Sequence, residues 1–244
     1  MSTPRQEIKF GLEIVSSIYL DKFLQENSFN ELYQPRHIYS TYCDTILDSF
    51  LEANIEGHDY RKKLRLRHYQ YTHINEQLLE GQVQLEEKSK YLYSTIKKKT
   101  PVSEDLYNIS LVYDPVYMMK VPVTIPSQAL CPGLVPRSIV AYRRRYYSDE
   151  KVRITIDDHI RFSEIDKFTR RASDFLKLKS AIILEVKSGI HTDLNNYEKL
   201  LLSIDSVERT KVSKYVASRA FFEPEIDSFY PEFTRYGHAT ESNL

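Results

Sequence analysis

Charged side chains recur at alternate positions in many short segments of the 244-residue chain. In the clearest instance, Lys63, Arg65 and Arg67 alternate with Leu64 and Leu66. Because successive side chains of a β-strand point to opposite faces of a sheet, this alternation predicts a strand with one charged face. Similar patterns predict further strands over residues 5–10, 83–90, 94–99, 138–147, 152–162 and 181–187.

Helical patterns separate and follow these strands. Apolar residues predict a helix over residues 12–24, with Val15, Ile18 and Tyr19 on a face that continues to Phe23. Further expected elements are a short helix over 44–53, a helix or long connection over 163–178, a helix over 194–204 capped by Asp193, and a helix from Asp205 or Ser206 to about 221.

The chain is predicted to form one domain. Strand-type segments follow each other without a linker-like break, so residues 1–222 are interpreted as a single unit with room for a sizeable core. Residues 223–244 contain Pro224 and Pro231 but no periodic pattern. We therefore expect this C-terminal tail to be loose.

Composition excludes several ways of binding phosphate. The six glycines lie far apart, so neither a dinucleotide-binding fingerprint nor a P-loop can be written. Any phosphate must therefore be held by side chains. Cys43, Cys131 and the seven histidines match no zinc-ligand spacing, so we expect reduced thiols, surface histidines and no zinc site.

Targeting signals are also missing from the sequence. Residues 1–10 lack the apolar core of a secretory signal. The longest uncharged stretch, Val121 to Pro136, is too short to cross a bilayer and contains four prolines. We expect a soluble, cytoplasmic protein.

The charge balance limits the partners of the protein as a whole. With 34 basic and 34 acidic residues, the formal net charge of zero argues against attraction to nucleic acid or an anionic membrane. Charged strand faces usually lie in water on the outside of a sheet. If the sheet closes into a barrel, the same faces can line a lumen that holds a charged ligand. Basic side chains would then bind phosphate oxygens, and interspersed carboxylates a divalent cation.

An ordered series of short motifs, from about Arg5 to about Ala220, resembles the VTC domain of polyphosphate polymerases within the triphosphate tunnel metalloenzymes. Each motif alone is weak, but the full series in this order is specific. Cys43 stands in place of an aromatic residue, and Glu87 in place of an apolar one. The matching segments are 5–10 (RQEIKF), 39–45 (YSTYCDT), 61–69 (RKKLRLRHY), 85–90 (LEEKSK), 95–99 (TIKKK), 142–144 (YRR), 152–157 (VRITID), 184–187 (LEVK) and 213–215 (SKY).

The resemblance implies an α+β fold in which eight antiparallel strands form a β-barrel tunnel with helices packed around it. It also implies that basic side chains inside the tunnel hold the phosphates. Lys62, Lys98 and Arg143 are expected to point outward, and the choice of Lys97 rather than Lys98 or Lys99 is open by one or two positions. The implied catalytic residues are Arg65, Arg67, Lys88, Arg144 and Arg153, and the implied substrate-binding residues are Lys9, Lys63, Lys97, Lys99, Lys187, Ser213 and Lys214.

A divalent cation, Mn²⁺ or Mg²⁺, is part of the same expectation. By matching position, Glu185 is the principal ligand, and Glu7 and Glu86 contribute directly or through water. Other interpretations stay open from the residues alone. Glu185 could pair with a tunnel arginine, and Ser213 and Lys214 could be plain helix-surface residues. Arg65, Arg67 and Arg153 could form salt bridges on an outer face.

The implied activity is that of an ATP-dependent polyphosphate polymerase, in which the γ-phosphate of ATP is transferred to a growing chain. Two alternatives remain: a tripolyphosphatase or nucleoside triphosphatase of the same fold, and a non-catalytic polyphosphate-binding module. The expected partners are ATP and polyphosphate. Nucleic acid is not expected, because tunnel walls cannot enclose a duplex. Any membrane partner would be a separate polypeptide.

Overall fold

The structure is a computed structural model that describes residues 5–71, 83–92, 94–103, 107–114, 119–126, 132–178, 181–211, 213–223 and 226. The predicted tail over 223–244 and Cys131 lie almost wholly outside these residues. The strands are β1 (Arg5–Glu13), β2 (Asn30–Asp44), β3 (Tyr60–Tyr71), β4 (Gln84–Tyr91), β5 (Ser94–Pro101), β6 (Tyr107–Asp114), β7 (Met119–Pro126), β8 (Val135–Ser148), β9 (Val152–Glu164), β10 (Leu176–Lys177), β11 (Ala181–Gly189) and β12 (Glu208–Arg209). The helices are the 3₁₀ turn η1 (Ile14–Ser16), α1 (Ser17–Glu26), α2 (Ser49–Ile55), α3 (Asn195–Leu202) and α4 (Lys214–Phe222).

One antiparallel sheet dominates the fold. Its hydrogen-bonded order is β12-β1-β11-β9-β8-β2-β3-β4-β5, with β10 attached to β9. Apart from the two-residue strands β10 and β12, it consists of eight long strands, the number that the family resemblance implies. The α+β class is therefore confirmed. The hairpin β6–β7 forms a separate two-stranded sheet.

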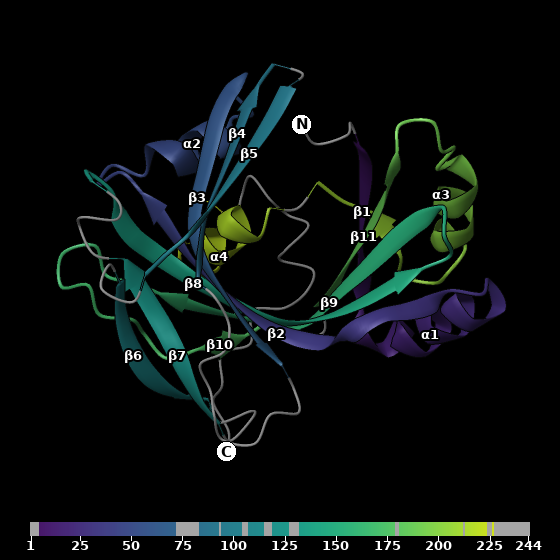
Figure 1. The fold of residues 1–244 in the computed structure, drawn as a ribbon, viewed down its shortest axis with the longest axis horizontal. Helices are drawn as coiled ribbons and strands as arrows, with labels where there is room; N and C mark the ends of the chain where they lie inside the picture. The colour runs from purple at the N-terminus through teal and green to yellow at the C-terminus, as the bar shows by residue number, and fades with distance from the viewer. Residues whose placement is uncertain are drawn as a thin grey trace.

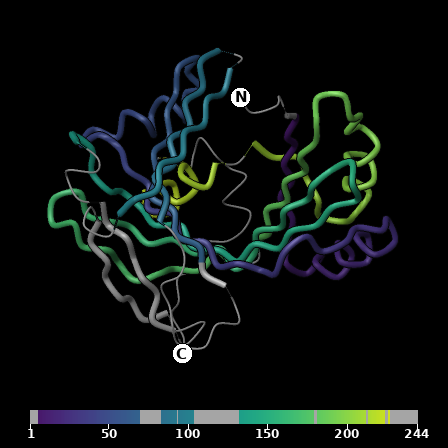
Figure 2. The backbone as a smooth tube through the Cα atoms, viewed as in Figure 1, coloured from purple at the N-terminus to yellow at the C-terminus, as the bar shows by residue number. Residues whose placement is uncertain are grey.

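The large sheet is strongly curved, and α4 lies within its curve (Figures 1 and 2). The helices α1 and α3 cover the outer side of the β1–β11–β9 part (Figure 1). The sheet path ends at β5 on one side and at β12, beside β1, on the other. The tunnel is thus a curled sheet whose two edge regions face each other, and its described strands form an open hydrogen-bonded path.

The outer core explains why one face of β1, β9 and β11 is apolar. Phe10 of β1, Ile154 of β9 and Leu184 of β11 pack with Leu20 and Leu201 from the two outer helices. These side chains alternate with charged residues along each strand, so burying one set directs the other set to the concave face. The alternation read from the sequence therefore separates a helix-covered outer face from a charged inner one.

A second core fills part of the concave side. Ile38 of β2, Tyr142 of β8 and Phe162 of β9 pack against Tyr215 and Val216 of α4. One region of the sheet's interior is thus closed by an apolar helix face. The rest of the concave surface carries the charges.

Several predicted elements differ from the structure. In residues 12–24, Leu12 belongs to β1, and the helix buries Leu20, Phe23 and Leu24 while Val15 and Ile18 are exposed. The expected apolar face is therefore buried at Phe23 but exposed at Val15, Ile18 and Tyr19. Of the two alternatives for residues 163–178, the structure has the long connection, which follows the end of β9 at Glu164 and contains the short strand β10. The helix expected from Asp205 or Ser206 starts only at Lys214, because residues 208–209 pair with β1 as β12.

The expected short helix and the expected set of strands also differ from the structure. The helix expected over 44–53 begins at Ser49, because Asp44 is still the last residue of β2. The strands β2, β6 and β7 were not among the periodic segments. In β2 the face toward α4 carries Ile38 and Tyr42 while Tyr39 and Cys43 are buried on the other, so polarity does not alternate. Only the motif around Tyr39 signalled this strand.

Two histidines correct the expectation of a surface location. His37 and His68 are 1% and 2% exposed. They lie on the outer face of β2 and β3, and β7 contacts both strands. Burial lowers the pKa of His68. Cys43 is a buried free thiol. Among the described residues, every helix is too short or too polar to cross a membrane.

The outer core should dominate stability. We expect Leu184→Ala to lower the free energy of unfolding by about 2–5 kcal/mol, because Leu184 is fully buried and its truncation leaves a cavity. Ile96→Ala on the edge strand β5 is the matched control; this side chain is 68% exposed and its loss should change stability by less than about 0.5 kcal/mol. Urea unfolding measures both, and equal effects would contradict the assignment of the core.

Candidate functional site

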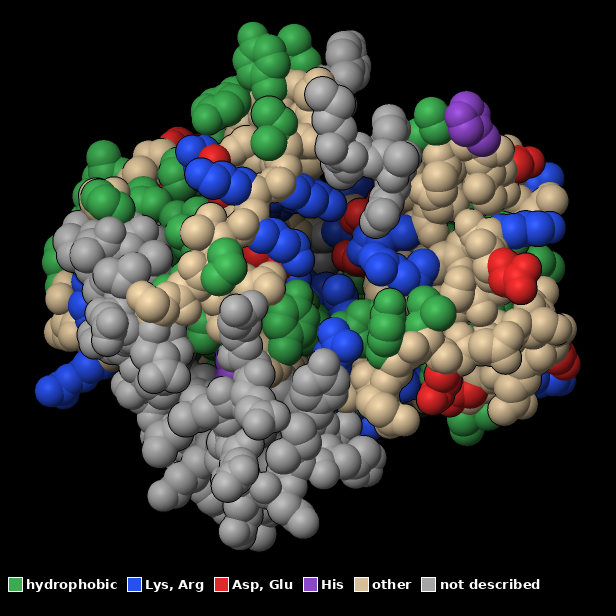
Figure 3. Space-filling model, viewed as in Figure 1, with side chains coloured by type: hydrophobic (Ala, Val, Ile, Leu, Met, Phe, Trp, Pro, Cys, Tyr) green, Lys and Arg blue, Asp and Glu red, His purple; other side chains and the backbone are tan. Residues whose placement is uncertain are grey.

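Basic side chains gather on the concave face of the sheet. Figure 3 shows the molecule hollowed between β3–β5 on one side and β1 and β11 on the other, with Lys and Arg around the opening and acidic groups beside them. The strands deliver these groups at alternate positions, and α4 supplies one more, Lys214. The described members are the basic residues Lys9, Lys63, Arg65, Arg67, Lys88, Lys97, Lys99, Arg144, Arg153, Lys187 and Lys214 and the acidic residues Glu7, Glu86, Asp157 and Glu185.

On the wall formed by β1 and β11, two carboxylates share two lysines. Lys9 Nζ lies 3.3 Å from Glu185 Oε1 and 3.4 Å from Glu7 Oε1. Lys187 is ion-paired with Glu185 and lies 4.0 Å from Glu7 Oε2. Burial raises the pKa of Glu185, but Lys187 and Lys9 outweigh it and hold the pKa well below its usual range. Both carboxylates are therefore ionised near neutral pH, since the pKa of Glu7 is lowered as well.

On the opposite wall, Glu86 of β4 is enclosed by cations. Arg65 donates to Glu86 Oε2 through Nε at 2.9 Å and Nη2 at 2.6 Å. Arg67 lies 3.3 Å from Oε2, and Lys99 Nζ lies 3.1 Å from Oε1. Burial raises the pKa of Glu86, but Arg67 and Arg65 lower it to about 2. This carboxylate organises the arginines of β3.

Aromatic hydroxyls hold the same arginines from the other side. Arg65 Nη1 donates to the Tyr42 hydroxyl at 3.0 Å, and Arg67 Nη2 to the Tyr142 hydroxyl at 3.3 Å. Arg67 Nε also donates to Ser40 Oγ at 3.2 Å. The guanidinium groups are thus fixed in orientation, which favours bidentate recognition of a phosphate or carboxylate.

The third cluster joins the sheet to α4. Arg144 of β8 binds both carboxylate oxygens of Asp157 on β9, at 2.5 and 2.6 Å. Lys214, the first residue of α4, lies 2.6 Å from Asp157 Oδ2 and 4.9 Å from the centre of the Tyr142 ring. Asp157 is fully buried. Burial raises its pKa, but Arg144 and Lys214 outweigh it, so this pKa is lowered.

Two lysines carry a poorly stabilised charge. Burial and the neighbouring charges of Lys88 and Lys9 lower the pKa of Lys63 to about 7. Its ammonium donates to Ser213 Oγ at 2.8 Å. Burial also lowers the pKa of Lys88, to about 8; Glu7 and Glu185 raise this pKa, and repulsion by Lys9 and Lys97 lowers it. An anion placed among these groups would restore their full charge.

The structure brings most of the predicted site residues to this one surface. The exception concerns the proposed metal ligands: Glu7 and Glu185 lie together, whereas Glu86 belongs to the arginine cluster on β3–β5. The described part of the chain contains no group of three or more His, Cys, Asp or Glu side chains arranged to hold a metal. Lys62 and Arg143 lie on the outer face, paired with Glu87 at 3.2 Å and Asp158 at 2.8 Å. Lys98 lies beside Glu87 as well.

Sequence reasoning passed over several groups of the site. Asp157 was seen only as part of a charged face, although it holds Arg144 and Lys214 together. Tyr42 and Tyr142 lie in the quoted motifs, and their hydroxyls bind the arginines. Arg36 of β2 lies over the rings of Tyr33 and Tyr146, 5.2 and 5.6 Å from their centres. Arg36 could not be identified from the sequence, because polar and apolar residues do not alternate along β2.

Taken together, the surface suits a long, flexible anion. Its cations come from several strands facing each other, and they outnumber the carboxylates. Lysines and arginines on opposite walls can contact successive phosphoryl groups of one chain. Phosphoryl transfer needs no nucleophilic side chain of the protein, because positioning and charge stabilisation dominate its catalysis.

Comparison with known proteins agrees with the motif series. The family model described as the VTC domain matches residues 11–223. No curated protein matches the chain.

Solved structures with a similar backbone have low sequence identity. A candidate adenylate cyclase from Vibrio parahaemolyticus is 12% identical with a TM-score of 0.48, covering 93% of this chain and 99% of that one. A candidate adenylyl cyclase from Hippeastrum with a dominant triphosphatase activity is 14% identical with a TM-score of 0.49, covering 88% and 94%. A Pyrococcus horikoshii protein is 10% identical with a TM-score of 0.46, covering 86% and 99%. These scores are too low to carry an argument about fold or function.

The buried charge of Lys63 predicts a pH-dependent stability. The unfolded pKa lies near 10.5 and the folded one at about 7, so the unfolded chain binds more protons between these values. The destabilisation is therefore complete below about pH 7 and disappears as the pH rises toward 10.5. We expect Lys63→Met to be more stable than the wild type at pH 6–7, on the order of a few kcal/mol, and to converge with it near pH 10.

Lys62→Met is the matched control, because Lys62 is the neighbouring lysine on the outer face of β3. Urea unfolding at pH 6, 7, 8.5 and 10 gives the difference in the free energy of unfolding between each variant and the wild type at each pH. A Lys63→Met advantage that is constant with pH, or shared by Lys62→Met, would contradict the buried charge.

Proposed function

The chain belongs to the VTC domain family, and from this premise we propose that it is an ATP-dependent, metal-dependent polyphosphate polymerase. The observation that carries the proposal is the excess of cations on the concave face, in particular Lys63 and Lys88, whose lowered pKa values leave them ready to bind an anion. A polyphosphate chain has the repeating charge that such a surface complements.

In the proposed reaction, a terminal phosphate oxygen of the growing chain attacks the γ-phosphorus of ATP. A new P–O bond forms as the bond to the β-phosphate breaks, and ADP leaves with the released electron pair. Arg65, Arg67 and Arg144 would bind non-bridging oxygens and stabilise the charge that accumulates during transfer. Lys63, Lys88 and Lys97, on adjacent strands, would hold the flanking phosphoryl groups in line.

The residues fit a divalent cation on the β1–β11 wall. Glu185 and Glu7 are ionised carboxylates within reach of the same lysines, and carboxylate oxygens are the ligands that Mg²⁺ and Mn²⁺ prefer. Such ions are commonly held by one or two carboxylates together with substrate phosphates, so a three-carboxylate cluster is not required. When bound, the ion would neutralise phosphate charge. Lys9 and Lys187 would then be freed to contact the phosphates.

The deciding experiment compares products. Purified protein is incubated with ATP and Mn²⁺, and polyphosphate is resolved by gel electrophoresis while orthophosphate and ADP are quantified. We expect long polyphosphate with one ADP released per phosphate added. ADP with orthophosphate alone would instead identify a hydrolase of the same fold, and tight polyphosphate binding without turnover a binding module.

Arg144 provides a sharp test of the concave face, because its neighbour points the other way. We expect Arg144→Gln to lower kcat by about 10²–10³-fold, as loss of a preorganised donor to developing charge does. Arg143→Gln is the matched control on the same strand, and it should keep activity within about twofold. If both variants fold and behave alike, the proposed face is wrong.

The metal assignment has its own prediction. Glu185→Gln should raise the Mn²⁺ concentration for half-maximal activity about tenfold or more, because even outer-shell changes cost 10–100-fold in metal affinity. Glu87→Gln, on the outer face of β4 beside Lys62, is the control and should leave the Mn²⁺ dependence unchanged. An unchanged Mn²⁺ dependence in Glu185→Gln would place the ion elsewhere.

A further inference from the structure

The N-terminal end of α4 reaches the charged surface directly. Ser213 caps the helix by accepting from the Val216 amide at 3.4 Å, and its Oγ also accepts from Lys63. Lys214 binds Asp157. Two predicted substrate-binding residues therefore depend on where this helix sits, and they are carried by its first turn rather than by a strand.

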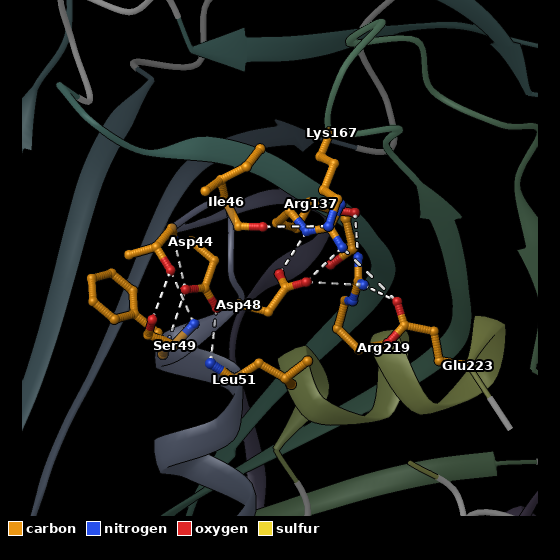
Figure 4. A network of polar contacts seen from close by, with 12 residues as sticks. Asp44, Ile46, Asp48, Ser49, Leu51, Arg137, Lys167, Arg219 and Glu223 are labelled. Carbon is orange, nitrogen blue, oxygen red and sulfur yellow. Dashed lines mark hydrogen bonds and ion pairs between the residues drawn. The ribbon is translucent and has the colours of Figure 1, made fainter. Parts of the chain in front are cut away.

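The other end of α4 is held by a network of two buried arginines and two partly exposed carboxylates (Figure 4). Arg137, near the start of β8, donates to both oxygens of Asp48, at 2.6 and 2.7 Å. Arg219 of α4 lies 3.6 Å from Asp48 Oδ2, is ion-paired with Glu223, and donates to the Arg137 carbonyl oxygen at 3.3 Å. The two arginines are 5% and 1% exposed. The network thus joins three parts of the fold: β8, the loop that precedes α2, and α4 itself.

A separate contact holds the first turn of the helix, through Tyr215. Asp44 ends β2, and its carboxylate accepts from the Phe50 and Leu51 amides at 2.8 Å each and from the Tyr215 hydroxyl at 2.6 Å. The Tyr215 ring stacks on Tyr42 with 4.9 Å between ring centres. Because Arg65 donates to the Tyr42 hydroxyl, this contact continues to the cationic wall.

The backbone of Asp48 is a sign that this arrangement is enforced. Asp48 has a φ of 57°, in the left-handed region that non-glycine residues adopt at a cost. Its carboxylate is turned toward two buried arginines from other elements. The bidentate contact to Arg137 offsets the cost, because breaking a buried ion pair is strongly destabilising.

We propose that Asp48 and Arg219 are positioning residues: through the network with Arg137 and Glu223, they fix α4 along and around its axis so that Ser213 and Lys214 stand at the charged surface. Neither Asp48 nor Arg219 belongs to the basic surface itself. Asp48 and Arg219 act on the basic surface through α4, which has nine residues and rises by about 1.5 Å per residue. The inference rests on the proposed function to the extent that Lys214 binds phosphate.

The test is a double-mutant cycle on the affinity for inorganic triphosphate, measured by calorimetry with the full chain. Asp48→Asn removes the charge but keeps a residue that tolerates the left-handed backbone. Asp48→Asn and Arg219→Met should each weaken binding about tenfold. In a Lys214→Met background, which itself binds more weakly, the same changes should have a much smaller effect, because the charged group that they position is gone.

Arg145→Met is the matched control. Arg145 is a partly buried arginine paired with Asp21 at 2.9 Å on the outer face of β8, so its loss should cost stability but leave the affinity for triphosphate unchanged. Unfolding midpoints show that every variant is folded at the temperature of the titration. If Arg219→Met does not fold, Arg219→Lys takes its place, with a smaller loss of affinity expected.

Two results would overturn the proposal. One is wild-type affinity in both Asp48→Asn and Arg219→Met. The other is a loss of the same size with and without Lys214, which would indicate a general structural effect.

If the wild-type protein does not bind triphosphate, the proposed function fails, and hydrogen exchange then decides the positioning role alone. The Ala217 amide donates to the Ser213 carbonyl oxygen at 2.8 Å. Its exchange should become at least about tenfold faster in Asp48→Asn and Arg219→Met than in Arg145→Met. Unchanged protection of Ala217 would overturn the inference.

Discussion

Compensation of charge inside a curved sheet is the constraint on which the structure depends. Glu7, Glu86, Asp157 and Glu185 each lie within ion-pair distance of two or more cations, which come from the same strand, from neighbouring strands or from α4. Removing one partner of such a pair leaves a buried charge at a cost of several kcal/mol. The carboxylates therefore hold the basic side chains in place, while the cations that exceed them remain available to an anion.

The same strands serve two purposes because their side chains alternate. In β1, β9 and β11 the apolar face is covered by α1 and α3. Their charged face is crossed by α4, which closes one region with apolar contacts and delivers Ser213 and Lys214 to the other. The position of α4 thus connects the packing of the domain with the chemistry of its surface.

The fold was predictable to the extent that polarity alternates. The strands around Lys63–Arg67 and Glu185–Lys187 were found from residues alone, whereas β2, with apolar and aromatic residues on both faces, was visible only through its motif. Val15 and Ile18 show a second kind of wrong prediction, because their helical spacing suggested a buried face but their side chains face solvent. Periodicity reports which residues share a face, and the neighbouring elements decide which face is buried.

By itself the sequence determined which side chains share a strand face, that phosphate must be held without a glycine loop, and the family resemblance that the VTC match supports. The tertiary structure alone decided which charges are neutralised by which partners. Glu86 is 21 residues from Arg65, Asp157 is 57 residues from Lys214, and Asp48 is 171 residues from Arg219 in the chain, yet each pair forms an ion contact. Electrostatic pairing depends on distance in space and on burial, and neither is encoded in local sequence pattern.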